Sequence, residues 1–276
     1  MIKYINGDCR HVIPNLNANV QSVITSPPYF NLRAYGNDGE IGVETDLEDY
    51  LSNLVDVFKL IKNVLNDDGT LWVNLGDTYA KRGCCGPDNI NRKAFKKKSN
   101  VKRKIPKGYK PKDLIGVPWL FAFEMIKIGY YLRSDIVWHK PNPMPENVKD
   151  RPTRSHEYFF LFSKSNKYYY NNEAIKERSK ASSLKRFKYK GNARYQDKRN
   201  IRDVWTIASS TTNRSKHCST FPIGLIKPAI LASTRPNDII LDPFSGIGTV
   251  GKLCKDMKRD FIGIELDKEF HNLSVL

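Results

Sequence analysis

The residues ITSPPYF at 24–30 place two consecutive prolines between a serine and a tyrosine, directly after an apolar run. Proline has no backbone N–H, so a Pro-Pro loop at a strand end offers carbonyl acceptors on a rigid backbone. Such a loop complements an amino group that must donate both of its hydrogens. We expect the Ser26 hydroxyl and the Pro27 carbonyl to accept them, and Tyr29 to stack on a nucleobase extruded from a duplex. A rigid turn at Pro27 and Pro28, without chemistry, is the alternative.

The reaction predicted for this loop is methyl transfer to the exocyclic nitrogen of cytosine or adenine. That nitrogen is a poor nucleophile, because its lone pair is delocalised into the ring. Accepting both of its hydrogens favours a tetrahedral nitrogen, whose lone pair can then face a methyl group on sulfur. Catalysis would rest on positioning and electrostatics, without a covalent intermediate.

A second candidate site is the segment DIILDPFSGIGTVGK at 238–252, in which an apolar strand-like run ends at Asp242. Its glycines are Gly246, Gly248 and Gly251. Their spacing matches the dinucleotide-binding pattern, and Glu265 follows at a distance suited to ribose hydroxyls. Asp242 would repel a pyrophosphate but suits an ammonium group. S-adenosylmethionine has an ammonium group, ribose hydroxyls and no phosphate, so it is the predicted cofactor. A tight turn without a ligand is the alternative.

The net charge of +17 is concentrated in two segments. Residues 81–112 contain thirteen Lys/Arg and one acid, which gives +12, and residues 176–202 contain eleven Lys/Arg and two acids, which gives +9. The rest of the chain is therefore mildly acidic, at −4. Basic runs can be solvated faces, but this concentration of charge is typical of proteins that bind a phosphate backbone. Neither run is amphipathic, so an anionic membrane surface is not expected as the partner.

Several classes are excluded by composition. No run approaches 18 consecutive apolar residues, and the start MIKYINGD lacks the apolar stretch of a signal peptide, so we expect a soluble, cytoplasmic protein. The five cysteines are scattered and form no CxxC pair. We therefore expect neither a disulfide framework nor a metal site.

The elements that position these motifs alternate along the chain. Strand-like apolar runs occur at 3–6, 20–25, 70–76, 133–139, 156–164, 238–242 and 260–266. Helix-like patterns occur at 47–65, 118–130 and 221–233. Seven strands that alternate with helices predict an α/β fold with a mostly parallel sheet covered on both faces. In such sheets ligands bind beyond the carboxyl ends of the strands, where both candidate motifs lie.

The order of the motifs predicts a circular permutation. Only 25 residues follow Gly251, so the remaining strands of the sheet must come from earlier in the chain. We expect the run at 3–6 to lie beside the strand that ends at Glu265. Asp8 then falls at the same edge of the sheet and could accept from an adenine amino group, or it could cap a turn or a helix. Asp77 is expected either to support the site from this edge or to cap a helix.

TSPPY at 25–29 and DPFSGIGT at 242–249, in this order, resemble the β-group of DNA amino-methyltransferases. Further matches are NGDC at 6–9, GTLWVNLGDTYA at 69–80, RSDIVWHKPNPMPE at 133–146, HEYFFLFSK at 156–164, TFP at 220–222 and FIGIEL at 261–266. The resemblance implies the class I S-adenosylmethionine-dependent methyltransferase fold, with a circularly permuted, mostly parallel seven-stranded sheet. It assigns Ser26, Pro27, Pro28 and Tyr29 to the target amine. It assigns to the cofactor the residues Asp8, Phe221, Pro222, Asp242, Pro243, Phe244, Gly246, Gly248, Thr249 and Glu265.

The resemblance also implies a division of the chain. Residues 1–80, 113–170 and 203–276 form the catalytic and cofactor-binding domain. The basic segment 81–112 is interpreted as a loop that clamps DNA, and 171–202 as the region that recognises the target sequence. The implied partners are double-stranded DNA and, functionally, a cognate restriction endonuclease, with the enzyme a monomer or a homodimer. We expect the enzyme in the cytoplasm, either as a prokaryotic protein associated with the nucleoid or as a protein encoded by a phage.

The base that is methylated follows less directly from the sequence. Serine at the first position of the catalytic motif resembles the N4-cytosine enzymes, whereas N6-adenine enzymes usually have Asp or Asn there. The chemistry alone leaves N6-adenine open, since the Ser26 hydroxyl can serve either amine. An RNA methyltransferase and an inactive DNA-binding protein are further alternatives. Methylation at cytosine C5 is excluded, because it needs a cysteine preceded by proline and none of the five cysteines has one.

Overall fold

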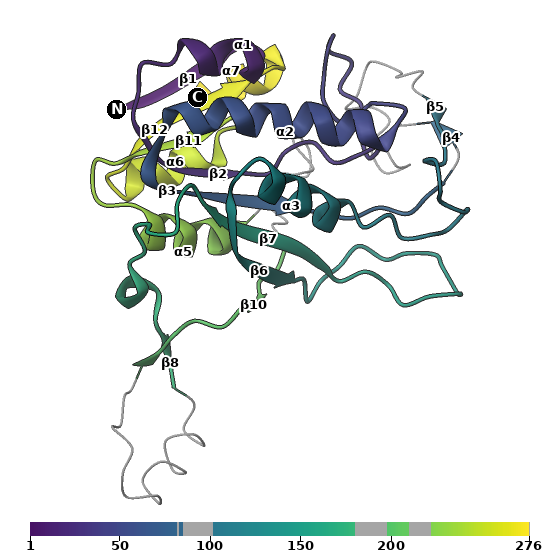
Figure 1. The fold of residues 1–276 in the computed structure, drawn as a ribbon. Helices are drawn as coiled ribbons and strands as arrows, with labels where there is room; N and C mark the ends of the chain where they lie inside the picture. Colours follow the sequence, from purple (N-terminus) through teal and green to yellow (C-terminus); the bar gives the residue numbers. More distant parts are fainter. Residues whose placement is uncertain (82, 85–101, 180–197, 210–221, 276) are drawn as a thin grey trace, which may run out of the picture.

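The computed structural model describes residues 1–81, 83–84, 102–179, 198–209 and 222–275. Its centre is an eight-stranded sheet in the order β1-β12-β11-β2-β3-β7-β6-β10 (Figure 1). The strands are β1 Ile2–Asn6, β2 Val20–Thr25, β3 Leu65–Leu75, β6 Tyr131–His139, β7 His156–Ser163, β10 Val204–Thr206, β11 Ile239–Asp242 and β12 Asp260–Glu265. All seven predicted strands are present. The eighth, β10, was not predicted because three residues are too few to show a periodicity.

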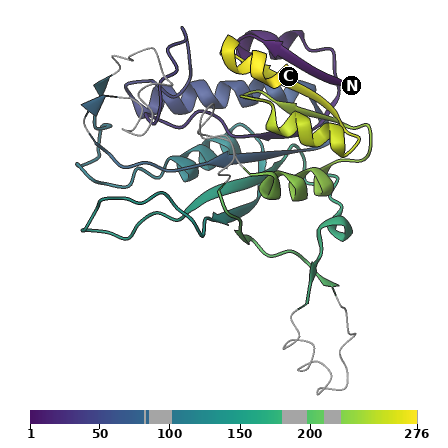
Figure 2. The same ribbon diagram turned by 180° about the vertical axis from the view of Figure 1, so that it is seen from behind.

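The sheet is mostly parallel, as predicted, and β7 is the exception. β7 runs antiparallel to both of its neighbours, β3 and β6. The parallel strands β2, β3, β6, β11 and β12 therefore end at the same edge at which β7 begins. We call this edge the catalytic edge. Figures 1 and 2 show that segments 76–81 with 102–116, and 140–155, extend outward from it.

Helices cover both faces of the sheet. One face carries α2 Leu47–Val64 and α3 Val117–Lys127, and the other carries α5 Ile223–Ser233 and α6 Thr249–Asp256. The other helical segments among the described residues are α1 Cys9–Val12, η1 Ile13–Asn15, η2 Asn172–Ile175 and α7 Lys268–Val275. Two small pairs of strands, β4 Gly83–Cys84 with β5 Lys102–Arg103 and β8 Glu177–Arg178 with β9 Lys198–Arg199, lie outside the main sheet. No helix among the described residues combines the length and apolar character needed to cross a bilayer.

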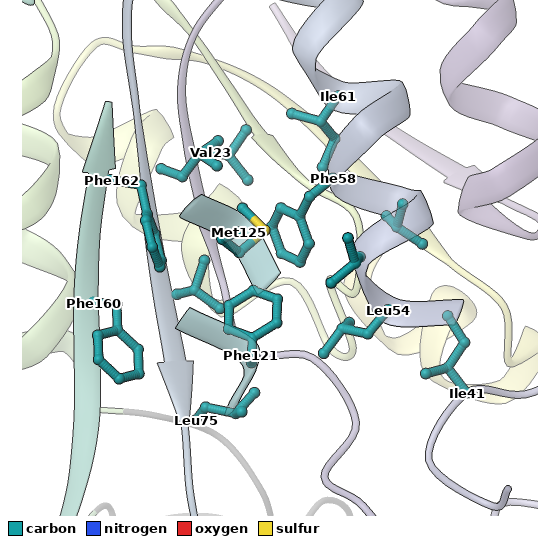
Figure 3. Close-up of a cluster of buried hydrophobic side chains, with 14 of the residues drawn as sticks. Val23, Ile41, Leu54, Phe58, Ile61, Leu75, Phe121, Met125, Phe160 and Phe162 are labelled. Carbon is teal, nitrogen blue, oxygen red and sulfur yellow. The ribbon is translucent and has the colours of Figure 1, made fainter. Parts of the chain in front are cut away.

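Two hydrophobic cores form because consecutive strand residues point to opposite faces. On β2, Val23 packs into the core under α2 and α3, while Ile24 packs into the core under α5. Figure 3 shows the first core, in which the ring of Phe121 on α3 packs near Phe58 of α2 and near Phe162 of β7, with centroid distances of 5.3 and 6.1 Å. These strands read as continuous apolar runs because both of their faces are buried.

The first strand of the chain completes the sheet beside the last one. β1 pairs in parallel with β12, from Ile2 opposite Phe261 to Asn6 opposite Glu265. The Tyr4 hydroxyl on β1 also donates to the carbonyl of Gly248, at 3.3 Å. The predicted circular permutation is therefore confirmed.

Candidate active site

The two candidate motifs leave adjacent strands at the catalytic edge. β2 and β11 pair in parallel, with Leu241 opposite Val23. Two positions further along β2, the Thr25 hydroxyl donates to the Asp242 carboxylate at 2.6 Å, and both side chains are buried. Ser26 is the next residue after Thr25. The catalytic loop therefore begins at the same edge of the sheet as the glycine-rich loop, on the adjacent strand.

The Pro-Pro loop is fixed by a hydrogen bond from α2 and by close packing against a glycine. The buried Tyr50 of α2 donates its hydroxyl to the Pro28 carbonyl, at 2.9 Å. Burial raises the pKa of Tyr50 far above its ordinary value, so this hydroxyl stays protonated and remains a donor. Gly42 has φ of +102°, and a Cβ there would lie 3.1 Å from Cβ of Pro28 and 3.2 Å from the carbonyl oxygen of Tyr29. The loop is thus fixed in place, with Pro27 buried and Ser26 partly exposed.

A carboxylate that the sequence analysis did not single out anchors Tyr29. The Tyr29 hydroxyl donates to Oε2 of Glu157 at 2.7 Å, and Nδ2 of Asn74 donates to the same oxygen at 3.1 Å. The other oxygen, Oε1, accepts from the Lys140 ammonium group. The Tyr29 ring lies against Gly76, where a Cβ would be 2.6 Å from Cε2 of the ring. Burial, followed by the nearby Glu157 carboxylate, raises the pKa of Tyr29 well above its ordinary value, so the phenol stays protonated.

The sequence analysis missed Glu157 because its position depends on the direction of β7. The run HEYFFLFSK was identified as a strand, and a parallel strand would have put Glu157 at the edge opposite the site. The antiparallel pairing puts it at the catalytic edge, with Glu157 opposite Trp138 on β6. An acidic residue at the start of an apolar strand was the available signal.

The glycine-rich loop has the geometry of a ligand-binding turn. Gly246 and Gly248 have φ of +51° and +77°, values that favour glycine. Glu265 accepts from the backbone N–H of Gly246 at 2.7 Å and from that of Asp267 at 2.8 Å. Each carboxylate oxygen has two lone pairs, so further hydroxyl donors can still bind Glu265. Burial raises the pKa of Glu265.

Two buried polar groups in this loop fit a polar, cationic ligand. The Ser245 side chain is 7% exposed, and its hydroxyl has no hydrogen-bond partner among the described residues. Burial raises the pKa of Asp242 to about 7, because the described residues supply hydrogen bonds but no countercharge. An ammonium group would supply that charge, and hydroxyls would satisfy the serine and the glutamate. The residues present therefore fit S-adenosylmethionine.

Two other candidates act as helix caps in the structure. The Asp8 carboxylate accepts from the backbone N–H of Arg10 at the start of α1, and it also pairs with the Arg10 guanidinium. The Asp77 carboxylate accepts from the backbone N–H groups of Gly116 and Val117, at the start of α3. The capping alternative is thus confirmed for both residues, and contact of Asp8 with a cofactor stays a prediction.

The remaining predicted residues are only partly described. Phe221 lies outside the described residues. Pro222 is buried and directly precedes α5, and its carbonyl accepts from the N–H of Leu225 at 2.9 Å. Most of the basic segments 81–112 and 171–202 also lies outside the described residues. The described end of the first segment is tied to the 140–155 segment by an ion pair of Lys112 with Asp150, at 2.6 Å.

Comparison with known proteins decides the family. A family model described as DNA methylase matches residues 20–276. The chain belongs to the N6/N4 DNA methylase family. Its relatives include the Type II methyltransferases M.Cfr9I of Citrobacter freundii, 46% identical over 98% of this chain and 85% of the relative, and M.SmaI of Serratia marcescens, 44% identical over 99% and 89%.

Solved structures confirm the fold of this DNA methylase. PvuII DNA methyltransferase, titled cytosine-N4-specific, has a TM-score of 0.68 at 19% identity and covers 99% of this chain and 86% of its own. A putative DNA modification methylase of Thermus thermophilus, solved in complex with S-adenosyl-L-methionine, has a TM-score of 0.63 at 20% identity and covers 99% and 91%. The class I methyltransferase fold is therefore confirmed. The methyl donor of this DNA methylase is S-adenosylmethionine, and its substrate is DNA.

Proposed function

We propose that this DNA methylase transfers a methyl group to the exocyclic N4 amine of a cytosine flipped out of duplex DNA. The observation that carries the proposal is the 2.6 Å hydrogen bond between Thr25 and Asp242. It joins the strand that leads into the catalytic loop to the adjacent strand that leads into the cofactor loop, which supports transfer between a base and a cofactor bound side by side. A base inside a duplex cannot reach such a site, so the target must be extruded.

The catalytic loop supplies acceptors for the amine. The Ser26 hydroxyl and the Pro27 carbonyl accept its two hydrogens, and Pro28 keeps the backbone rigid with help from Tyr50. Tyr29 provides a ring face for the base. These residues hold a pyramidal nitrogen in line with the methyl group, so that positioning and electrostatics lower the barrier.

The cofactor loop supplies the complementary charge. When bound, S-adenosylmethionine supplies a methyl group activated by its positive sulfur. Asp242 pairs with the ammonium group, Glu265 accepts from the ribose hydroxyls, and Asp8 accepts from the adenine amine. The backbone that surrounds the ligand comes from Pro243, Phe244, Gly246, Gly248 and Thr249, with Phe221 and Pro222 packing beside it.

The basic segments are assigned to DNA. Residues 81–112 clamp the phosphate backbone and residues 171–202 recognise the target sequence. The other ranges, 1–80, 113–170 and 203–276, form the body that carries out the transfer. The Type II names of the relatives support a cognate restriction endonuclease as a functional partner.

Cytosine is preferred over adenine as the target for two reasons. Ser26 occupies the first position of the catalytic motif, where N4-cytosine enzymes of this family have serine. The structural neighbour with a TM-score of 0.68 is titled cytosine-N4-specific. Both reasons favour N4-methylcytosine as the product.

The test is methylation of unmodified DNA with labelled S-adenosylmethionine, followed by mass spectrometry of the released nucleosides. We expect N4-methylcytosine. N6-methyladenine as the product would contradict the cytosine assignment and leave the amine chemistry intact. Label found only in RNA would overturn the substrate.

A further inference from the structure

The side chains of Ser26, Tyr29 and Glu157 form one directed chain of hydrogen bonds. The Tyr29 O–H has two acceptors within reach, Oε2 of Glu157 at 2.7 Å and Oδ1 of Asn74 at 3.4 Å, and the shorter hydrogen bond goes to Glu157. Oη of Tyr29 then has only lone pairs left for Ser26. The Ser26 hydroxyl accordingly donates to Tyr29, across 3.5 Å. Catalytic hydrogen bonds are often long in the free enzyme and shorten in the substrate complex.

The direction of this chain determines what Ser26 offers to the substrate. A serine hydroxyl can donate or accept, and a donor would compete with the amine rather than bind it. Because the Ser26 hydrogen is used toward Tyr29, only its lone pairs remain for the pocket. The serine is thus turned into an acceptor by a carboxylate two hydrogen bonds away.

Glu157 is itself held in one orientation, because groups from different elements bind both of its carboxyl oxygens. Its two oxygens are bound by different groups, Oε2 by Tyr29 and Asn74 and Oε1 by the Lys140 ammonium group. The Glu157 and Lys140 side chains are 17% and 20% exposed, so water screens their attraction only in part. Lys140 is fixed in turn by the Trp138 ring, whose centroid lies 4.3 Å from Nζ. A partly exposed carboxylate of this kind can accept a proton and release it to solvent.

We propose that Glu157 is a positioning residue that orients Ser26 as an acceptor and takes up, through Tyr29, the proton released by methyl transfer. This proposal deepens the proposed function and rests on it. In the transfer, the N–CH3 bond forms with the lone pair of the amine, and the S–CH3 bond breaks with its electrons remaining on sulfur. The methylated nitrogen then carries one excess proton.

The proton leaves along the same chain of hydrogen bonds. The nitrogen gives it to Oγ of Ser26, the Ser26 hydrogen moves to Oη of Tyr29, and the Tyr29 hydrogen moves to Oε2 of Glu157. Both hydroxyls end protonated, so neither the serine nor the phenol has to ionise. Glu157 ends as a neutral carboxylic acid, which loses its proton to water and resets the site. No other acid or base is needed for the balance.

The test is a double-mutant cycle of Glu157→Gln and Tyr29→Phe, measured as the single-turnover rate of label transfer to DNA. Single turnover isolates the transfer step from product release. Each single variant should lose at least about tenfold in rate, as expected for a lost proton acceptor. Dissociation constants for S-adenosylmethionine and DNA should stay within about twofold, because neither change removes a binding group. The double variant should be no slower than the Tyr29→Phe variant, since both changes break one chain.

A matched control and a second variant keep the outcome clear. Glu124→Gln removes an exposed carboxylate that pairs with Lys127 on α3, and it should leave the rate unchanged. Multiplied losses in the double variant, or a normal rate in Glu157→Gln, would overturn the proposal. If Glu157→Gln does not fold, a normal rate in the Tyr29→Phe variant overturns it, since that change removes only the hydroxyl. The assay counts label on any base. A product other than N4-methylcytosine would therefore contradict the proposed function, but it would not change the comparison of rates between the single and double variants.

Discussion

The Thr25 hydroxyl and the Asp242 carboxylate, 217 positions apart in the sequence, are joined by a buried hydrogen bond of 2.6 Å. Thr25 is the last residue of β2 and Asp242 is the last residue of β11. The bond therefore fixes the distance between the loop that receives the target base and the loop that receives the cofactor. A change at either residue is expected to affect both loops.

Replacing Thr25 by valine should destabilise the protein. Valine has nearly the same shape but no donor, so the Asp242 carboxylate loses its strongest hydrogen bond in a buried site. We expect the free energy of unfolding to fall by about 1–3 kcal/mol, measured by urea denaturation. Thr25→Ser, which keeps the hydroxyl, is the matched control. An unchanged free energy of unfolding in Thr25→Val, with a loss only in Thr25→Ser, would show that the methyl group of Thr25, not its hydroxyl, is important.

Asp242→Asn should stabilise the free protein by an amount that grows as the pH rises from about 4 to about 7 and is then constant. The Asp242 pKa is about 7 when folded, above the ordinary value of about 3.9, so the wild type loses stability as the pH rises between these values. The amide cannot ionise and avoids this loss. We expect the variant to gain on the order of 2–4 kcal/mol at pH 8 and almost nothing at pH 4. Thermal melts across this range measure the difference, and a gain that is independent of pH would contradict it.

The same variant should bind S-adenosylmethionine more weakly. Binding of an ammonium group favours the ionised carboxylate, so wild-type affinity should rise between pH 6 and pH 8 as Asp242 loses its proton. Asp242→Asn should abolish that rise. Isothermal titration calorimetry at several pH values checks both statements, and an unchanged pH dependence would remove Asp242 from the cofactor site.

Gly76→Ala should slow methyl transfer by displacing Tyr29. The added Cβ would lie 2.6 Å from the Tyr29 ring and 3.4 Å from Cδ of Glu157, so the ring must move. We expect the single-turnover rate to fall at least about tenfold, because small displacements at a reacting centre are costly. Gly224→Ala on α5 is the control, since its nearest neighbour is the Ile207 side chain at 3.3 Å. A normal rate for Gly76→Ala would show that Tyr29 does not need its present position.

Neutralising the exposed lysines Lys104, Lys107 and Lys110 with glutamine should weaken DNA binding equally on all sequences. Contacts to phosphates release counterions, so the slope of log affinity against log salt should flatten by up to about 0.9 per lost contact. Lys255→Gln on α6 is a control at an exposed lysine away from this segment. A change in sequence preference with an unchanged slope would mean that the segment reads bases instead of clamping phosphates.

Most of the fold could be predicted because it depends on local patterns and on their order. Apolar runs gave the seven strands, and the late position of Gly246 and Gly248 indicated the permutation. The direction of β7 could not be predicted, because strand pairing is a property of the folded sheet. Glu157 was missed for this reason. Asp8 and Asp77 were considered for the site and were found to cap helices. An aspartate after a strand can cap a helix or bind a ligand, so its residue type alone does not distinguish the two roles.

The pairing of β1 with β12 has a consequence for the synthesis of the protein. Asn6 and the Glu265 carbonyl that it binds are 259 positions apart, so a ribosome releases β1 long before its partner exists. Contacts of such long range form late in folding. A nascent chain that has already exposed its Pro-Pro loop therefore still has no methyl-donor pocket. DNA can therefore be methylated only after translation has delivered β12 and the glycine-rich loop that precedes it.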